Sequence, residues 1–326
     1  MIGFELFSYL AKCRKAIVLG IGGGGDIFAT IPTRNFLKKL GLEVYVGCVA
    51  WERFVVDPKP GPRSLEELEN IIKVSETVCI GGPNTVTNDG IKLQASHLSE
   101  KLNEEVVLVD ITKGVANTSR GLDEALSRLN VDLLIGVDGG GDVLARGVEK
   151  NLRSPLCDSI MLASLYNMEK ENFLGVFGVG CDGELSIEEI LIYISDIASH
   201  DGYLGAYGMT REDVEILEML TFGMPSEVSK IALLSFKGRR GEVWIRDGLW
   251  RAETSMISTI TFYLDTEKTY SLSPLAKAVS SSKDIFEANQ RLNEMGIKTE
   301  LDLEIEAYRK GAKSYRELFK EDSKKY

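Results

Sequence analysis

The first 180 residues of the chain alternate short apolar runs with longer stretches in which apolar residues recur at helical spacing. We predict buried strands at residues 16–20, 44–50, 77–80, 106–111, 133–137 and 174–179. The helical stretches between them lie near residues 27–40, 64–73, 89–102, 118–129 and 158–169. Strands that alternate with helices of this length predict a doubly wound, mostly parallel α/β sheet of Rossmann-like type. Ligands of such a sheet bind outside the carboxyl ends of its strands.

The pattern changes after residue 187. A helix is predicted to run toward His200, followed by a loop at 201–208 and an amphipathic helix at 211–221. We predict a C-terminal β-hairpin within residues 231–248, joined at 238–241, then a strand at 259–264 and two helices after Ser273. The proline-rich segment 53–64 predicts an extended surface loop. Residues 1–200 therefore form the α/β core, and residues 201–326 are either a small appended subdomain or a completion of the same sheet.

One glycine-rich loop that ends in an aspartate occurs twice. Residues 17–29 read IVLGIGGGGDIFA and residues 133–145 read LLIGVDGGGDVLA, with six of the thirteen positions identical. Each copy follows a predicted strand and precedes a predicted helix, an arrangement that exposes backbone N–H groups where anions bind. The repeat predicts a ligand held between two related half-sites. The glycines that we expect to contact it are Gly22, Gly23, Gly24, Gly25, Gly139, Gly140 and Gly141.

The acids of these loops have two explanations. In the first, Asp26, Asp138 and Asp142 bind Mg²⁺, which bridges to a phosphate, because oxygen ligands suit that ion. In the second, Asp26 and Asp142 only cap helices and Asp138 is an ordinary turn residue. Asp138 replaces Gly22 of the first copy, so the two loops differ chemically. We therefore expect Asp138 and Asp142 to be the reactive carboxylates, with Asp26 as a ligand-binding residue.

Other strand ends supply further candidates. Gly81, Gly82, Asn84 and Thr85 follow the third predicted strand, where they either bind sugar or amide groups or form a plain Gly-Pro turn.

Three single residues complete the candidate site. Lys113 either neutralises a phosphate or is a solvated lysine. Asp182 belongs to a third, degenerate glycine-acid loop, in which Cys181 is a weaker candidate nucleophile because no histidine is near it in sequence. His200 is a candidate general acid or base, and a cation at a helix C-terminus explains it equally well.

The composition narrows the class of partner. The chain has 326 residues and a net charge of −11, which argues against a nucleic-acid backbone as the main partner. It contains no run of 18 apolar residues, so no membrane-spanning segment is expected. Its five cysteines show no CxxC spacing and are interpreted as reduced thiols of a cytoplasmic protein. A homo-oligomer is expected on general grounds for such a protein.

The motifs also suggest a family. GIGGGGDIFAT, GGPNT, DITKG and GVDGGGDVLARG together resemble the mainly archaeal proteins catalogued as domain of unknown function 1152. The resemblance covers nearly the whole chain, and the paired GGGD loops are its most specific part. It implies a cytosolic protein without an assigned activity, so it supplies no catalytic residues.

Three functions remain open at this point. The leading hypothesis is an enzyme that binds a nucleotide or phosphorylated metabolite and performs Mg²⁺-assisted phosphoryl or glycosyl transfer, or hydrolysis. The second is an NAD(P)-dependent oxidoreductase, which the GxGxxG spacing of residues 20–25 favours and Asp26 opposes, because a carboxylate there would repel a pyrophosphate. The third is a non-catalytic oligomer that senses a nucleotide.

Overall fold

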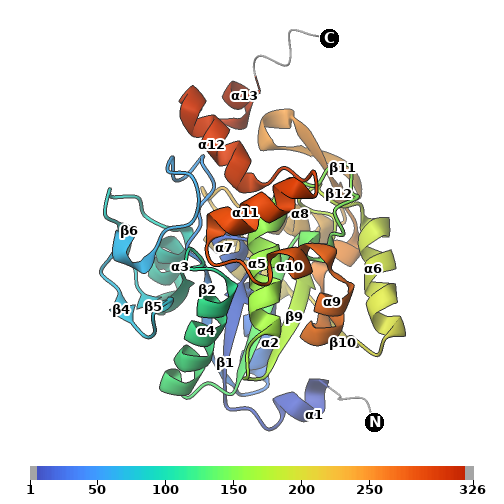
Figure 1. The fold of residues 1–326 in the computed structure, drawn as a ribbon. Coiled ribbons are helices and arrows are strands. Elements are labelled where there is room, and N and C mark those ends of the chain that lie inside the picture. The colour runs from blue at the N-terminus through green and yellow to red at the C-terminus, as the bar shows by residue number, and fades with distance from the viewer. Residues whose placement is uncertain (1–5, 320–326) are drawn as a thin grey trace.

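A nine-stranded sheet forms the centre of the protein in the computed structural model, which describes residues 6–319 (Figure 1). Its strands follow the order β10, β13, β9, β8, β1, β2, β7, β5 and β4. Their bounds in chain order are β1 Lys15–Gly20, β2 Glu43–Val49, β4 Ile72–Lys73, β5 Val78–Gly81, β7 Val106–Val109, β8 Leu133–Gly139, β9 Asn172–Phe177, β10 Tyr203–Gly208 and β13 Ile260–Asp265.

The middle of the sheet is parallel. Strands β7, β2, β1, β8 and β9 lie side by side in that order and all run in the same direction. Numbered along the chain, these five strands have the order 3-2-1-4-5, which is that of a doubly wound nucleotide-binding sheet. The predicted fold class is therefore confirmed. In this order the chain reverses its direction of winding between β1 and β8, and ligands of such sheets bind at that point.

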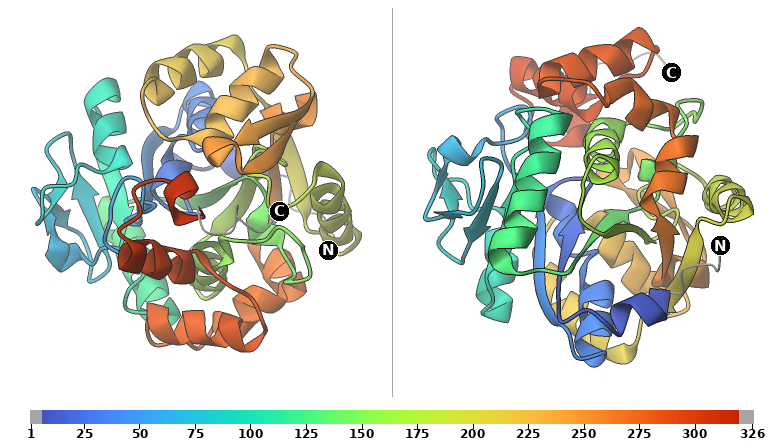
Figure 2. Two further views of the ribbon diagram at one scale, coloured as in Figure 1. Left: turned by 90° about the horizontal axis from the view of Figure 1, so that it is seen from above. Right: turned by 60° about the horizontal axis from the view of Figure 1, so that its bottom comes forward.

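Helices cover both faces of the sheet (Figure 2). Alternate residues of β1 point to opposite sides, so that Ile17 and Leu19 enter one core while Ala16 and Val18 enter the other. The first core is covered by α4 Val115–Leu129, α5 Pro155–Tyr166, α6 Ile187–Ser199, α9 Thr266–Leu272, α10 Pro274–Val279 and α11 Ile285–Glu294. The second is covered by α1 Leu6–Leu10, α2 Ile31–Lys39, α3 Gln94–Leu102, α7 Arg211–Thr221 and α8 Glu227–Phe236.

The outer strands on both sides of the sheet run antiparallel to their neighbours. Strand β5 corresponds to the predicted strand 77–80, but it runs against β7 and pairs Gly81 with Val106. Its carboxyl end therefore lies beside the start of β7. We call the side of the sheet where the parallel strands begin its amino edge, and the side where they end its carboxyl edge. A short apolar run indicates a buried strand and carries no information on its direction, which is why the sequence did not predict this reversal.

The second part of the chain differs from its prediction in several elements. Residues 231–236 belong to helix α8, and the hairpin comes one segment later, as β11 Gly241–Ile245 and β12 Trp250–Thr254. The predicted loop at 201–208 contains strand β10, whereas the predicted strand at 259–264 is present as β13. Both strands extend the central sheet. A short apolar run such as IALLSF fits a strand and a buried helix equally well, and periodicity cannot separate the two.

Two further predicted helical regions are also different. Residues 64–73 contain the short helix η2 Leu65–Glu67 and strands β3 Leu68–Glu69 and β4, of which β3 pairs with β6 Val86–Thr87. The segment after Ser273 forms α10, α11, α12 Glu300–Lys310 and α13 Tyr315–Leu318, more helices than the two predicted. Helices α12 and α13 lie at the opposite end of the molecule from α1 (Figure 1). No helix within residues 6–319 is long and apolar enough to cross a membrane.

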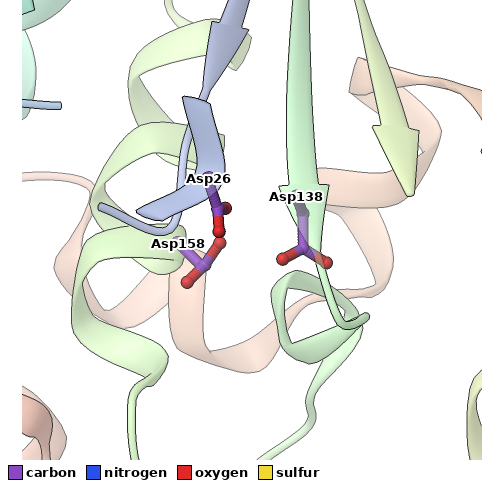
Figure 3. A group of neighbouring side chains, drawn as sticks. All are labelled: Asp26, Asp138 and Asp158. Atoms are coloured by element: carbon purple, nitrogen blue, oxygen red, sulfur yellow. The ribbon is translucent and has the colours of Figure 1, made fainter. Parts of the chain in front are cut away.

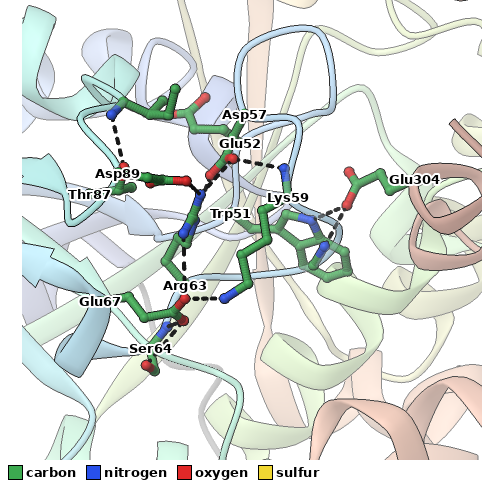
Figure 4. Close-up of polar contacts among 12 residues, drawn as sticks. Trp51, Glu52, Asp57, Lys59, Arg63, Ser64, Glu67, Thr87, Asp89 and Glu304 are labelled. Carbon is green, nitrogen blue, oxygen red and sulfur yellow. Dashed lines mark hydrogen bonds and ion pairs between the residues drawn. The ribbon is translucent and has the colours of Figure 1, made fainter. Parts of the chain in front are cut away.

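The proline-rich segment after β2 forms a loop as predicted, and a buried ionic network holds it (Figure 4). Val55 and Pro58 of this loop are exposed, whereas other residues of it are buried. Arg63 is 2% exposed and donates two hydrogen bonds to the carboxylate of Asp57, at 2.7 and 2.8 Å, and one to Asp89 at 2.9 Å. The indole N–H of Trp51 donates to Glu304 of α12 at 2.8 Å. Proline indicates an extended backbone but not exposure. The network fixes the position of this segment, which carries Arg53.

Candidate functional site

The two glycine-rich loops lie side by side at the carboxyl edge of the sheet. Strands β1 and β8 are parallel neighbours, with Gly20 paired to Val137, so the loops that follow them leave the sheet together. One carboxylate joins the two loops. Oδ2 of Asp26 accepts a hydrogen bond from the N–H of Gly22 in its own loop, at 2.8 Å, and from the N–H of Gly139 in the other loop, at 3.1 Å.

The glycines of both loops make room for acidic side chains. A Cβ atom at Gly22 would lie 2.6 Å from Oδ2 of Asp26, and one at Gly24 would lie 2.6 Å from Oε1 of Glu52. In the second loop, a Cβ at Gly140 would lie 2.0 Å from Oδ2 of Asp182. Distances this short exclude any side chain unless the carboxylate moves. The close approach of protein carboxylates therefore explains four of the loop glycines, namely Gly22, Gly24, Gly139 and Gly140. Gly23 instead meets the carbonyl oxygen of Trp51, and Gly141 meets the side chain of Ile190.

Several N–H groups that we expected to bind a phosphate are already used by the protein. Those of Gly22 and Gly139 donate to Asp26. The N–H of Gly24 donates to the carbonyl oxygen of Trp51 at 2.8 Å, and that of Gly140 donates to the carbonyl oxygen of Phe177 at 2.8 Å. These four donors are not available to a ligand, so a direct phosphate cradle at these positions is not what the loops form.

Three carboxylates meet beneath the two loops: Asp26, Asp138 and Asp158 (Figure 3). One oxygen atom from each lies within 4.8 Å of the others. Asp138 belongs to β8, whose strand continues as far as Gly139, and Asp158 lies in the first turn of α5. Asp138 and Asp158 are 0% and 1% exposed, and their four oxygen atoms accept no hydrogen bond from any residue between 6 and 319. Burying unpaired carboxylates is costly, so this arrangement calls for protons or a cation.

Asp142, which we predicted as a metal ligand, lies outside this group of three. Its Oδ2 accepts a hydrogen bond from the hydroxyl of Ser154 at 3.3 Å, and it lines the same cavity. Asp158 takes its place in the group. The sequence analysis missed Asp158 because an acid in the first turn of a helix is common, and nothing in the sequence indicates that α5 begins beside the loops.

Burial raises the pKa values of the acids around the cavity. The pKa of Asp26 rises to about 6, because burial outweighs the two backbone hydrogen bonds it accepts. The pKa of Asp182 rises to about 7, through burial and repulsion from Glu184. Burial and mutual repulsion raise the pKa values of Asp138, Asp142 and Asp158 well above the usual range.

A cavity of about 130 Å³ adjoins the carboxylates and is lined by residues of both loops. Two cations face it. Arg53 donates from Nη2 to the carbonyl oxygen of Gly22 at 2.9 Å, and Arg246 donates from Nε to Glu227 at 3.2 Å. Tyr315 of α13 also lines the cavity. Neither arginine was predicted from the sequence, because a single arginine belongs to no motif.

A comparison with known protein families agrees with the sequence motifs. The family model described as "Protein of unknown function (DUF1152)" matches residues 17–308. The chain belongs to this family. No curated protein and no solved structure matches it. The matched part of this DUF1152 protein contains the three clustered carboxylates and both arginines, and it ends before Tyr315.

The GGPNT turn of the DUF1152 protein lies away from the cavity. Because β5 is antiparallel, Gly81, Gly82, Asn84 and Thr85 follow it at the amino edge of the parallel strands. They stabilise a local turn instead. The hydroxyl of Thr85 accepts a hydrogen bond from the N–H of Gly82 at 2.9 Å and donates one to the carbonyl oxygen of Asn70 at 2.9 Å.

His200 also lies at the amino edge. It follows α6, which runs back along the sheet from the end of β9, and its Nδ1 lies 2.8 Å from the carbonyl oxygen of Asp196. The next strand, β10, begins beside Leu264, which in turn pairs with Leu174 near the start of β9. In this DUF1152 protein, His200 therefore cannot reach a ligand held between the glycine loops.

Lys113 follows β7 at the carboxyl edge of the sheet, but it does not line the cavity. Its Nζ donates to the carbonyl oxygen of Glu76 at 3.3 Å and lies 3.5 Å from the carboxylate of the same residue. Asp182, in contrast, does line the cavity, and its Oδ2 has no hydrogen-bond partner within residues 6–319. The thiol of Cys181 is buried, which raises its pKa and makes it a poor nucleophile.

Proposed function

We propose that this protein is an enzyme that binds a divalent cation, Mg²⁺ foremost, at Asp26, Asp138 and Asp158 and uses it to act on a phosphorylated small molecule. The observation that carries the proposal is the pair of buried carboxylates, Asp138 and Asp158, whose oxygen atoms lack hydrogen-bond partners within the described chain. Mg²⁺ binds oxygen ligands and commonly joins one or two carboxylates to substrate phosphates. The cluster also lies at the switch point between β1 and β8, where ligands of this fold bind.

The other side chains around the cavity suit phosphoryl transfer or hydrolysis. A bound divalent cation supplies charge stabilisation at a phosphoryl oxygen. Arg53 and Arg246 face the same cavity and provide positive charge for the remaining phosphate oxygens. Asp182 has a pKa of about 7 and a carboxylate oxygen without a partner in the described chain, which suits proton transfer near neutral pH. The loops contribute by fixing Asp26 through two backbone N–H groups.

The size of the cavity favours a small phosphorylated metabolite over a nucleotide. Pockets for drug-sized ligands typically measure about 300–1,000 Å³. The cavity beside the three carboxylates measures about 130 Å³. A phosphate with a short organic group fits this space better than a base, a ribose and a phosphate together.

An NAD(P)-dependent oxidoreductase is the second candidate, because the strand order and the glycine spacing of residues 20–25 are those of a dinucleotide-binding fold. Two contacts oppose it. The N–H groups of Gly22 and Gly24 donate to Asp26 and Trp51, and the carboxylate of Asp26 lies beside the loop that would hold the pyrophosphate.

Isothermal titration calorimetry of the metal-free protein with MgCl₂ at pH 8 tests the proposal. We expect a single saturable site in the natural protein and none in the Asp158→Asn variant, because the substitution removes one of three charged ligands. The exposed Asp201, at the far edge of the sheet, offers the matched control Asp201→Asn, which should bind Mg²⁺ normally. NAD⁺ should produce no heat of binding. Heat with NAD⁺ but not with Mg²⁺ would favour the oxidoreductase.

A further inference from the structure

Gln94, the first residue of α3, lines the cavity and carries a buried hydrogen-bond acceptor that is not used within the described chain. The residue is only 3% exposed. Its Oε1 accepts no hydrogen bond from any residue in the described part of the chain. Most buried polar atoms of folded proteins do have a partner. A buried amide oxygen without one, beside a cavity, indicates that a ligand supplies the donor.

Glu52 fixes the orientation of this amide. Its Oε2 accepts a hydrogen bond from Nε2 of Gln94 at 2.7 Å, and its Oε1 accepts one from the backbone N–H of Gln94 at 2.7 Å. An ionised carboxylate can only accept, so the NH₂ group of Gln94 must face Glu52, which leaves Oε1 as the free atom. Glu52 itself is 3% exposed and packs against Gly24, where a Cβ would lie 2.6 Å from its Oε1.

Gln94 and Arg53 adjoin the same glycine loop. A Cβ at Gly25 would lie 3.8 Å from Nε2 of Gln94, and a Cβ at Gly23 would lie 3.8 Å from Nη2 of Arg53. The first loop is therefore flanked by a cation and by the fixed amide group of Gln94, whose Nε2 lies nearest to Gly25. An anionic group of a ligand would be attracted to Arg53, and a donor group of the same ligand would complete the hydrogen bonding of Gln94.

We propose that Gln94 determines the specificity of the cavity by accepting a hydrogen bond from a hydroxyl group of the ligand, with Glu52 as its positioning residue. The proposal rests on the proposed function for the cation and the phosphate, and it adds the class of substrate. That class is a small phosphate ester whose organic part carries hydroxyl groups, such as a polyol or sugar phosphate. Dianionic alkyl phosphates, which carry no hydroxyl group, leave Oε1 of Gln94 buried and unpaired.

Two phosphate esters of equal charge and carbon number test this proposal. Glycerol 3-phosphate and n-propyl phosphate differ in their hydroxyl groups, and each is titrated calorimetrically into the natural protein at saturating Mg²⁺. We expect glycerol 3-phosphate to bind at least about tenfold more tightly than n-propyl phosphate, because only glycerol 3-phosphate can donate a hydrogen bond to the buried acceptor. Equal affinities, or no binding of either ester, would overturn the proposal without any variant.

Two variants assign the preference to its residues. Gln94→Met keeps an unbranched side chain of similar length and should abolish the preference for glycerol 3-phosphate over n-propyl phosphate. Glu52→Gln should weaken the preference, because an amide at position 52 no longer imposes one orientation on Gln94. A purely structural defect would weaken the binding of both esters equally, and a preference that persists in Gln94→Met contradicts the assignment.

Binding of Mg²⁺ alone is measured in parallel. If Mg²⁺ binds and the preference is absent, this inference fails while the proposed cation site stands.

Discussion

Asp138→Asn is expected to make the metal-free protein more stable and to abolish its stabilisation by Mg²⁺. Asp138 is fully buried, its carboxylate lacks a hydrogen-bond partner in the described chain, and Asp26 and Asp158 lie beside it. Asparagine is uncharged, so it removes the cost of burying this carboxylate or of keeping it protonated, and it brings an NH₂ group that can donate to a neighbouring carboxylate. Replacing a buried ion pair by neutral residues of similar volume is often neutral or stabilising by about 1–4 kcal/mol, and we expect a gain of that order here. The same change removes a charged metal ligand.

The measurement is urea unfolding with and without saturating MgCl₂. The natural protein should gain stability with Mg²⁺, because the ion binds only the folded chain, and Asp138→Asn should gain none. Asp201→Asn, which also removes one negative charge but lies at the far edge of the sheet, should respond to Mg²⁺ as the natural protein does. A variant that is less stable than the natural protein without metal, yet is still stabilised by Mg²⁺, would show that Asp138 has a structural role alone.

The stability of the metal-free protein should fall as the pH rises from about 4 to about 7. Folding raises the pKa of Asp26 to about 6 and that of Asp182 to about 7, while the same groups in the unfolded chain titrate near the ordinary value. Within this window the folded state holds protons that the unfolded chain has released, so each rise in pH favours unfolding. Each unit of pKa shift corresponds to about 1.4 kcal/mol, which places the loss for Asp26 alone on the order of 3 kcal/mol.

Mg²⁺ should remove much of this loss and should bind more tightly as the pH rises, because protons compete for the same carboxylates. Urea unfolding at several pH values between 4 and 8, with and without MgCl₂, measures both effects. Other buried acids with raised pKa values, such as Glu304, contribute to the loss in both conditions. The difference between the two curves therefore isolates the cluster. Parallel curves, with the same pH dependence in both conditions, would contradict a cation at these carboxylates.

The sequence was sufficient to predict the parallel core and the meeting of the two glycine loops. Both conclusions follow from local patterns, since apolar runs of four to seven residues mark buried strands and a repeated loop marks related positions. The direction of β5 could not be predicted, because its pairing with β7 depends on contacts between segments distant in the chain. For the same reason we expected the GGPNT turn and His200 at the carboxyl edge of the sheet. They follow β5 and α6, which run toward the amino edge.

The chemistry of the loops was predicted only in part. Asp26 and Asp138 were found through the repeat, whereas Asp158 lies in a helix that contacts the loops only in the folded chain. The repeated glycines suggested a phosphate close to the backbone, but in the structure carboxylates occupy the space beside Gly22, Gly24, Gly139 and Gly140. A glycine in a sequence indicates a close approach, and the approaching group is known only once the chain has folded.

A crystal structure of the protein grown with MnCl₂, with anomalous diffraction data collected at the manganese absorption edge, tests the central claim most directly. Mn²⁺ stands in for Mg²⁺ and takes the same oxygen ligands. We expect an anomalous peak bonded to one oxygen each of Asp26, Asp138 and Asp158, at about 2.0–2.2 Å. A structure with the same fold and saturating Mn²⁺, in which those three carboxylates bind no ion, would contradict it.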